Sequence, residues 1–240
     1  MVRSAEGRKM GMRRVVLLLA AMSLALLPVS GVALAQSVPG EVPDASCPTN
    51  SGPPTLTAFF RSSAIEAQTF TAEHTGLLTS AQVQVWNFLN EPAGIVMEIR
   101  AVDASGTPTG VVLASTTIPA SDVPTGQYGL ATGHFSPGAP VETGQQYALA
   151  LHTSAEVQGN GFGWQGSISN PCPGVLYNAL ETNPGVFQAP FQQNADVFFS
   201  TFVTLRTAPQ TKADCKKGGY KEFGFKNQGQ CIKAVKNQTP

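Results

Sequence analysis

An aromatic residue enclosed by glycines is the first candidate for chemistry. Trp164 lies in the run Gly161-Phe162-Gly163-Trp164-Gln165-Gly166, where small neighbours leave its ring uncrowded. The apolar face of such a ring packs against the C–H groups of a sugar, and the Gln165 amide could hydrogen-bond to sugar hydroxyls. The run therefore predicts a glycan-stacking platform. The other aromatic candidates for it are Trp86, Phe88, Phe162, Tyr177 and Phe187.

The alternative interpretation of the two tryptophans is structural. Large aromatic rings in β-proteins usually fill the core, where they remove the most apolar surface from water. This interpretation is favoured over binding for Trp164, and more strongly for Trp86.

Lysines interleaved with aromatic residues form a second candidate site, in residues 211–240. Ammonium groups pair with anionic groups and rings stack, so the segment predicts polyanion binding. In an exported protein we expect the partner to be an anionic cell-wall polymer and not nucleic acid. Alternatively, the rings form a small core beneath solvated lysines. The candidate binding residues are Lys216, Lys217, Tyr220, Lys221 and Lys226, and the segment also contains Phe223, Phe225, Lys233 and Lys236.

Catalytic patterns are missing from the sequence. It contains no G-x-S-x-G, H-E-x-x-H or P-loop pattern. The three histidines, His74, His134 and His152, are far apart, and a metal site would require strand pairing to bring His134 and His152 together. We expect separate, half-exposed histidines instead, and we predict no catalytic residue and no cofactor.

Acidic residues offer two weaker candidates. Glu98 lies inside an alternating segment beside Arg100, which predicts a solvated surface ion pair and not a catalytic carboxylate. The oxygen-rich run Asp103-Ala104-Ser105-Gly106 could hold calcium, as sandwich loops sometimes do, but a turn explains it more simply.

The N-terminus predicts export. Lys9 to Arg14 form a positively charged n-region, and Val15 to Leu27 form an apolar run interrupted only by Ser23. Ala33-Leu34-Ala35 matches a signal-peptidase site. The apolar run is shorter than the ~20 residues that span a bilayer, so residues 1–35 are interpreted as a cleaved signal peptide. An uncleaved membrane anchor is the alternative. The mature protein is expected to be secreted, or held at the cell surface by non-covalent contacts.

The four cysteines agree with an exported chain, in which an even number indicates disulfides. Cys215 and Cys231 lie together in the basic tail, whereas Cys47 and Cys172 lie in proline-rich loops. Of the three possible connectivities we favour Cys215–Cys231 with Cys47–Cys172. No short C-x2-C spacing suggests zinc.

Charge is divided unevenly along a chain whose formal net charge is zero. Residues 36–210 carry three basic and twelve acidic side chains, a net charge of −9, and residues 211–240 carry seven lysines and two acids, a net charge of +5. The body should repel polyanions, and only the tail could attract them.

Apolar residues alternate with a period of two through most of the mature chain. Examples are the segments 55–60, 81–86, 95–102, 147–152 and 197–203, with Pro- and Gly-rich turns between them. Only 12 % of residues are charged and Gly and Pro number 24 and 18, which excludes a long helical bundle. The predicted fold is a two-sheet antiparallel β-sandwich, jelly-roll-like, over residues 55–207. A Pro-rich linker (36–54) precedes it, and a small disulfide-bonded hairpin lies within the tail (208–240).

Two sets of motifs resemble known families. Segments such as Gln68-Thr69-Phe70-Thr71-Ala72 and Gly144-Gln145-Gln146-Tyr147 resemble uncharacterised β-sandwich modules of secreted bacterial proteins, over residues 55–207. The tail CKKGGYKEFGFKNQGQC is similar to a cysteine-bracketed motif of exported actinobacterial proteins, which usually carry Trp at the position of Tyr220. The resemblance implies a sandwich and an exported location, and it implies no catalytic activity.

Together these features predict a secreted, non-enzymatic binding or surface module for an extracellular polysaccharide or an anionic cell-wall polymer. Two alternatives stay open, an extracellular polysaccharide hydrolase and a purely structural envelope protein. An exposed pair of carboxylates in a cleft beside Trp164 would favour the hydrolase.

Overall fold

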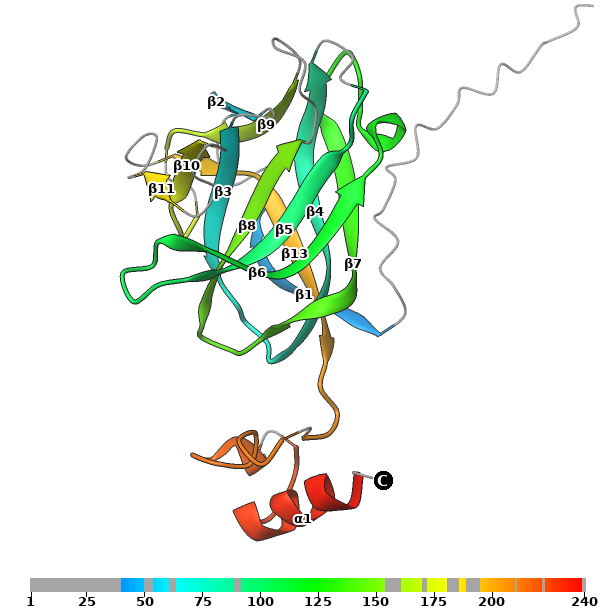
Figure 1. Cartoon of the computed structure of the whole chain (residues 1–240), viewed down its shortest axis with the longest axis vertical. Coiled ribbons are helices and arrows are strands. Elements are labelled where there is room, and N and C mark those ends of the chain that lie inside the picture. Colours follow the sequence, from blue (N-terminus) through cyan, green and yellow to red (C-terminus); the bar gives the residue numbers. More distant parts are fainter. Residues whose placement is uncertain are drawn as a thin grey trace, which may run out of the picture. The chain divides into compact units, whose positions relative to one another are not determined.

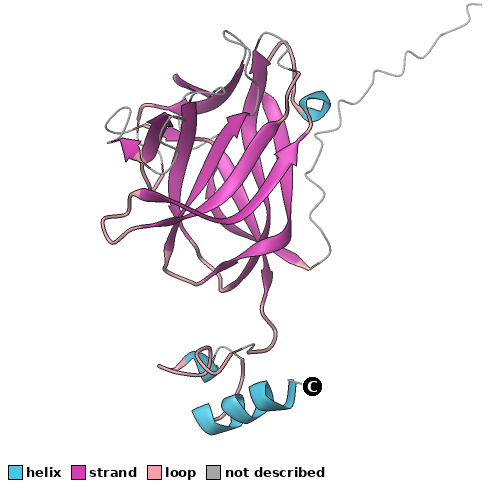
Figure 2. Ribbon diagram, viewed as in Figure 1, coloured by secondary structure: helices cyan, strands magenta, loops and turns pink. Residues whose placement is uncertain are grey.

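The computed structural model describes residues 40–49, 54–60, 64–88, 92–153, 161–169, 172–180, 186–188, 195–209, 211–221 and 223–238. The predicted signal peptide, residues 1–35, lies outside the described residues. The described chain forms two antiparallel sheets and a short C-terminal segment that ends in a helix (Figure 1, Figure 2). None of the helices in this part of the chain is long and apolar enough to cross a membrane.

The first sheet contains β1 (Glu41–Cys47), β2 (Leu56–Phe60), β4 (Gly76–Phe88), β7 (Gly129–Val141), β9 (Gly161–Ser167), β12 (Asp196–Val197) and β13 (Phe199–Leu205). Its order is β1-β13-β4-β9-β12, and in addition β2 pairs with β9 and β7 with β4. β13 and β9 pair with successive parts of the long strand β4. Phe199 of β13 pairs with Val83, and Trp164 of β9 pairs with Val85. Phe198 links the two, accepting a hydrogen bond from the Gln84 amide and donating one to the Gln165 carbonyl.

The second sheet contains β3 (Ala64–Thr71), β5 (Ile95–Val102), β6 (Pro108–Ile118), β8 (Gln146–Thr153), β10 (Leu176–Leu180) and β11 (Phe187–Gln188). Its order is β11-β10-β3-β8-β5-β6. The two sheets pack face to face, because alternate residues of each contribute to one apolar core. Val83 and Val85 of the first sheet and Met97 and Ile99 of the second are all fully buried in it. The predicted all-β sandwich is therefore confirmed.

The middle of the segment expected to be a linker, residues 36–54, belongs to the sandwich. Residues 41–47 form β1, an edge strand that pairs with β13. Pro43 precedes an irregularity in this pairing before Ser46, and an edge position beside a bulge is where a strand tolerates a proline. The composition alone, rich in proline, hid this strand.

The C-terminal segment differs from the expected hairpin. It consists of turns, the 3-10 helix η2 (Gly219–Lys221) and the α-helix α1 (Gln228–Gln238), and none of its described residues is in a strand. The Asn227 side chain accepts a hydrogen bond from the Gln230 amide, which caps the first turn of α1. The apolar residues of α1 are spaced at Cys231, Ile232 and Val235, a helical and not a strand period.

Both favoured disulfides are present. Cys47 bonds to Cys172 across 125 positions of sequence, and Cys215 bonds to Cys231 across 16. The first joins the edge strand β1 to the segment before β10, and the second closes the C-terminal segment on itself.

Candidate functional site

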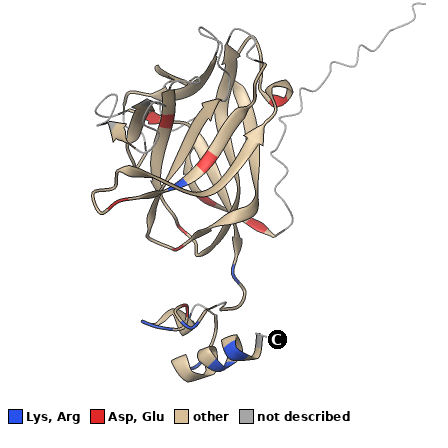
Figure 3. Ribbon diagram, viewed as in Figure 1, with Lys and Arg blue, Asp and Glu red and all other residues tan. Residues whose placement is uncertain are grey.

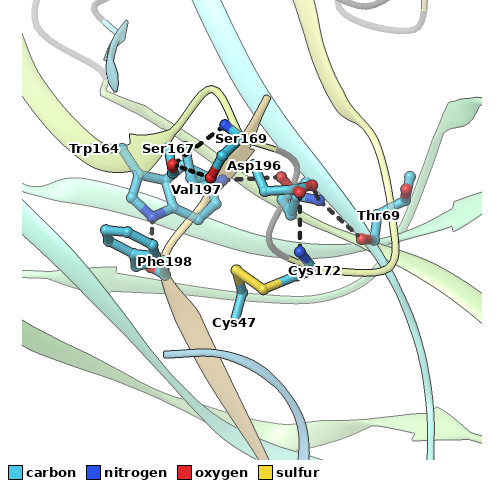
Figure 4. Close-up of a disulfide and its surroundings, with 10 residues drawn as sticks. Cys47, Thr69, Trp164, Ser167, Ser169, Cys172, Asp196, Val197 and Phe198 are labelled. Carbon is cyan, nitrogen blue, oxygen red and sulfur yellow. Dashed lines mark hydrogen bonds between the residues drawn. A yellow bond between two sulfur atoms is a disulfide. The ribbon is translucent and has the colours of Figure 1, made fainter. Parts of the chain in front are cut away.

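Trp164 occupies the core. Its side chain is fully buried, and its Nε1 donates a hydrogen bond of 2.9 Å to the Phe198 carbonyl oxygen (Figure 4). The ring is therefore not available to stack on a ligand from solvent, and the core interpretation is correct. Tyr177 is also buried, at 8 % exposure, on the outer face of the second sheet among small side chains and Phe187. Neither residue offers the stacking face that the sequence suggested.

The core interpretation of Trp86 is wrong. This residue lies on the outer face of the first sheet. Along β4, Val83 and Val85 point into the core, so Trp86 and Phe88 point outward and are only partly buried. The Trp86 ring meets Phe88 edge-on at 5.2 Å between centroids and Tyr128 at 5.7 Å. Phe59 of β2 contacts Phe88 at 5.6 Å and is 55 % exposed. We call these four residues, Phe59, Trp86, Phe88 and Tyr128, the aromatic patch.

A glycine lies in the middle of the patch. Gly163 of β9 pairs with Trp86 on one side and with Phe59 on the other, so the central residue of this row contributes no side chain of its own. A Cβ atom at Gly163 would lie 2.9 Å from the Tyr128 hydroxyl and 3.0 Å from the Thr57 methyl carbon. The same hydroxyl makes a hydrogen bond of 2.5 Å with Thr57 Oγ1. In the run that contains Trp164, the residue that shapes the patch is therefore Gly163. Because it has no side chain, it leaves room for the Tyr128 hydroxyl and the Thr57 methyl group.

Neutral polar side chains continue this face along β4. Gln84 and Gln82 lie two and four residues before Trp86, so they point to the same outer face, and both are partly exposed. Gln82 donates a hydrogen bond of 3.2 Å to Thr132 Oγ1 of β7. Gln165 of β9, which the sequence proposed as a hydroxyl-binding residue, is partly exposed and pairs with Thr57.

A depression of about 150 Å³ lies on this face. Its lining includes Thr49, Gln82, Gln84, Leu130 and Ser200, so amide and hydroxyl groups border it together with one exposed aliphatic side chain. We call the depression and the aromatic patch together the patch-and-amide face. None of the side chains that we assign to this face carries a formal charge.

The ion pair predicted at Glu98 and Arg100 is present but is not solvated. The Arg100 Nη2 lies 2.6 Å from Glu98 Oε2, and the two residues are only 4 % and 9 % exposed. His152 Nε2 lies 3.5 Å from the other Glu98 oxygen, and the Arg100 guanidinium lies over the Phe187 ring. Burial alone would raise the pKa of Glu98, but the hydrogen bond from His152 and the charge and hydrogen bond of Arg100 outweigh it and lower that pKa.

The histidines do not form a common site. His134 lies on β7 of the first sheet and His152 on β8 of the second, while His74 lies in the turn before β4. Among the described residues, no three His, Cys, Asp or Glu side chains gather into a set that could hold a metal ion. The Asp103 run is the expected turn, since its carboxylate accepts hydrogen bonds from the Ser105 and Thr107 amides.

Two buried carboxyl groups lie inside the sandwich, and one of them, Asp196, contacts a residue of the long-range disulfide. Asp196 accepts hydrogen bonds from Gln68 Nε2 at 2.9 Å and from the Cys172 amide at 3.2 Å (Figure 4), and burial raises its pKa. Glu66 is 3 % exposed, and burial raises its pKa to about 8 against a hydrogen bond from Asn178. Glu66 Oε2 has no hydrogen-bond partner among the described groups. Both groups lack access to solvent, so neither provides the exposed carboxylate of a hydrolase.

In the tail, the aromatic residues and the lysines are separated. Tyr220, Phe223 and Phe225 are partly buried against the Cys215–Cys231 disulfide, as the small-core interpretation predicted. All seven lysines of the tail are exposed, and they form the main concentration of positive charge in the described chain (Figure 3). The exposed ones include the four candidates Lys216, Lys217, Lys221 and Lys226.

Comparisons with known proteins assign no family. No family model matches the chain, and no curated protein matches it. Among solved structures the chain is similar to a crystal structure of a glycoside hydrolase family 43 arabinoxylan arabinofuranohydrolase from Bacillus subtilis in complex with cellotetraose, with 13% sequence identity and a TM-score of 0.28. The match covers 52% of this chain and only 25% of that chain. A likeness this slight does not bear on function.

Proposed function

We propose that this protein is a secreted, non-enzymatic module that binds a neutral extracellular polysaccharide on the patch-and-amide face of its first sheet. The observation that supports the proposal most directly is the aromatic patch around Gly163, in which Phe59 is exposed and the other three rings are partly buried, placed beside outward-pointing amides. Export is supported by the N-terminal signal-like sequence and by the two disulfides.

The composition of the face suits a sugar chain. Sugars present apolar C–H faces and rings of hydroxyl groups, so a binding site needs flat aromatic surface together with neutral donors and acceptors. Phe59, at 55 % exposure, supplies accessible ring surface, and Gln84 and Gln165 supply amides. Each amide both donates and accepts hydrogen bonds, which matches the hydroxyl group.

The charges indicate that the glycan is neutral. None of the described side chains that we assign to the face is cationic, so none of them would pair with a uronate, sulfate or phosphate. Residues 36–210 carry a net charge of −9, so the field around the sandwich would disfavour an anionic chain. None of the described side chains that we assign to the face is acidic, so these residues provide no acid–base pair for hydrolysis.

The test is binding of the mature chain, residues 36–240, to a panel of neutral polysaccharides such as cellulose, xylan, mannan, β-glucan and chitin. We expect binding to at least one of them, and a loss of at least about tenfold in affinity for the Trp86→Ala and Phe59→Ala variants, because stacking contacts of exposed rings carry much of the binding energy of such sites. Val111→Ala, which removes an apolar side chain that is 58 % exposed on the other sheet, is the matched control and should bind normally.

Two results would overturn the proposal. One is unchanged polysaccharide binding by both aromatic variants, and the other is no binding of the folded wild type to any neutral glycan. Release of reducing sugar by the mature chain would instead support the hydrolase alternative.

A further inference from the structure

The apolar core of the C-terminal segment contains none of its lysines. Its small core consists of Cys215, Cys231 and Val235, against which four partly buried residues pack, namely Tyr220, Phe223, Phe225 and Ile232. These residues and the disulfide account for the apolar contacts of the segment. The lysines lie outside this core and are exposed to solvent.

The lysines have no anionic partners in the described chain. No ion pair joins any of them to a described residue. Within the described part of the segment the acidic residue is Asp214. Its carboxylate pairs with Arg206 at 3.3 Å and accepts a hydrogen bond from the Thr211 amide. Seven ammonium groups within one small unit repel one another, which lowers its stability. A bound anion would relieve that repulsion.

One lysine also occupies an unfavourable backbone conformation. Lys217 has a φ of 51°, in the left-handed region, and it is the non-glycine residue of the described chain with a positive φ. A side chain in this region costs about 1 kcal/mol or more relative to glycine. Gly218, the next residue, also has a positive φ, of 97°, so the turn combines the strained lysine with an adjacent glycine and exposes Lys216 and Lys217 together.

The type of cation narrows the class of ligand. The segment contains lysine and no arginine, so it lacks the planar fork that recognises one carboxylate or phosphate by shape. Clustered lysines act as point charges and respond to the charge density of a flexible chain. Since stacking rings are occupied in the small core, recognition of exposed bases is not expected from this surface.

We propose that residues 211–221 and 223–238 form a second binding site, for a linear anionic polysaccharide or polyol-phosphate chain, and that it acts independently of the patch-and-amide face. Lys216, Lys217, Lys221 and Lys226, with Lys233 and Lys236 of α1, supply the positive charge. The protein would then hold a neutral glycan through its sandwich and an anionic polymer through its tail. The two sites use different chemistry, so they can be tested separately.

The experiment measures retention of the mature chain on immobilised polygalacturonate, a polyol phosphate, heparin and double-stranded DNA across a salt series. We compare wild type with a variant in which Lys216, Lys217, Lys221 and Lys226 are all changed to Gln. At low salt we expect the variant to bind the non-nucleic polyanions at least about tenfold more weakly, with a shallower dependence of log affinity on log salt. Changing the same four lysines to Arg should preserve binding, because the charge is kept.

Matched controls separate this site from the first one and from loss of folding. Gln228→Ala and Gln230→Ala alter exposed neutral residues of α1 and should leave retention unchanged. Lys217→Gly should weaken retention while making the segment no less stable to heat, because it relieves the left-handed strain. Trp86→Ala should leave polyanion retention unchanged, and the four-Gln variant should bind neutral glycans normally.

Equal retention of wild type and the four-Gln variant would overturn the proposal, as would loss of binding in the four-Arg variant. Retention on DNA alone would show that the ligand class is wrong. A failure of the neutral-glycan experiment would leave these outcomes unaffected.

Discussion

Trp86 and Phe59 lie on opposite sides of Gly163, in one row of three paired residues across β4, β9 and β2. Neighbouring strands are about 4.8 Å apart, so the two aromatic positions are separated by roughly 10 Å. The Tyr128 hydroxyl and the Thr57 methyl group lie over the glycine between them. Phe88 and Tyr128 hold the Trp86 ring by edge contacts. The proposed glycan site rests on this row, in which the Phe59 and Trp86 positions flank a glycine covered by the Tyr128 hydroxyl.

Gly163→Ala tests the importance of this spacing. Its Cβ would lie 2.9 Å from the Tyr128 hydroxyl, so the tyrosine must shift and its hydrogen bond with Thr57 should weaken. We expect a several-fold loss in neutral-glycan affinity and a loss in stability on the order of 1 kcal/mol. Isothermal titration and urea unfolding measure the two effects. Gly229→Ala, whose Cβ would make an ordinary contact of 3.4 Å, is the control; unchanged affinity in Gly163→Ala would contradict the prediction.

Truncation of Trp164 should mainly lower stability, whereas truncation of Trp86 should mainly lower glycan affinity. Trp164→Ala removes a fully buried ring and its hydrogen bond to Phe198, so we expect a loss of about 3–5 kcal/mol in the free energy of unfolding. Trp86→Ala removes a partly exposed ring and should cost clearly less stability but abolish most glycan binding. Chemical denaturation of both variants checks the order, and a larger stability loss for Trp86→Ala would place that ring in the core after all.

Glu66 should make the protein less stable at alkaline pH. Its folded pKa, about 8, lies above the ordinary value of 4.5, so its contribution is fully present below pH 4.5 and is lost as pH rises through 8. The shift corresponds to a loss on the order of 5 kcal/mol once the group is ionised. Glu66→Gln keeps an oxygen for Asn178 and does not ionise, so it should be more stable than wild type at pH 9 and similar at pH 4.

Urea unfolding at pH 4, 7 and 9 measures this difference. Val111→Ala removes an exposed side chain that does not ionise, so its effect on stability should not vary with pH. A constant difference between Glu66→Gln and wild type across this range would contradict the assigned pKa.

Removal of Arg100 should expose the cost of a buried charge. Arg100→Met leaves Glu98, at 9 % exposure, without its closest cation, and we expect a loss of about 3–5 kcal/mol. The double variant Glu98→Gln with Arg100→Met should recover much of that loss, because no unpaired charge stays buried. Thermal unfolding of the single and double variants gives the coupling, and additive losses would disprove it.

The two disulfides should differ in their effects. In the chain-entropy model a bond across 125 positions contributes about 5 kcal/mol and one across 16 about 3 kcal/mol. Changing Cys47 and Cys172 to Ala should therefore destabilise the sandwich. Changing Cys215 and Cys231 to Ala should remove hydrogen-exchange protection from residues 211–238 and leave the sandwich protected, since the tail has its own small core. Loss of protection in both parts would show that they fold as one unit.

The sequence by itself determined the sandwich and the two disulfides. Period-two alternation at 95–102 and 147–152 specifies strands, because only an extended chain sends successive side chains to opposite faces. The pairing of Cys215 with Cys231 follows from their closeness in the chain. The small aromatic core beside that disulfide was also foreseeable, since the rings lie between the two cysteines.

Only the tertiary structure decided which tryptophan is exposed. Alternation in β4 places Val85 and Trp86 on opposite faces but does not say which face meets the other sheet. Phe59, Trp86 and Gly163 are distant in the chain and meet only because β9 pairs with both β4 and β2. The burial of Glu98 and Arg100 was likewise hidden, because solvent access depends on segments remote in sequence. Strand period is a local property, whereas the choice of buried face and of neighbouring strands results from packing of the whole chain.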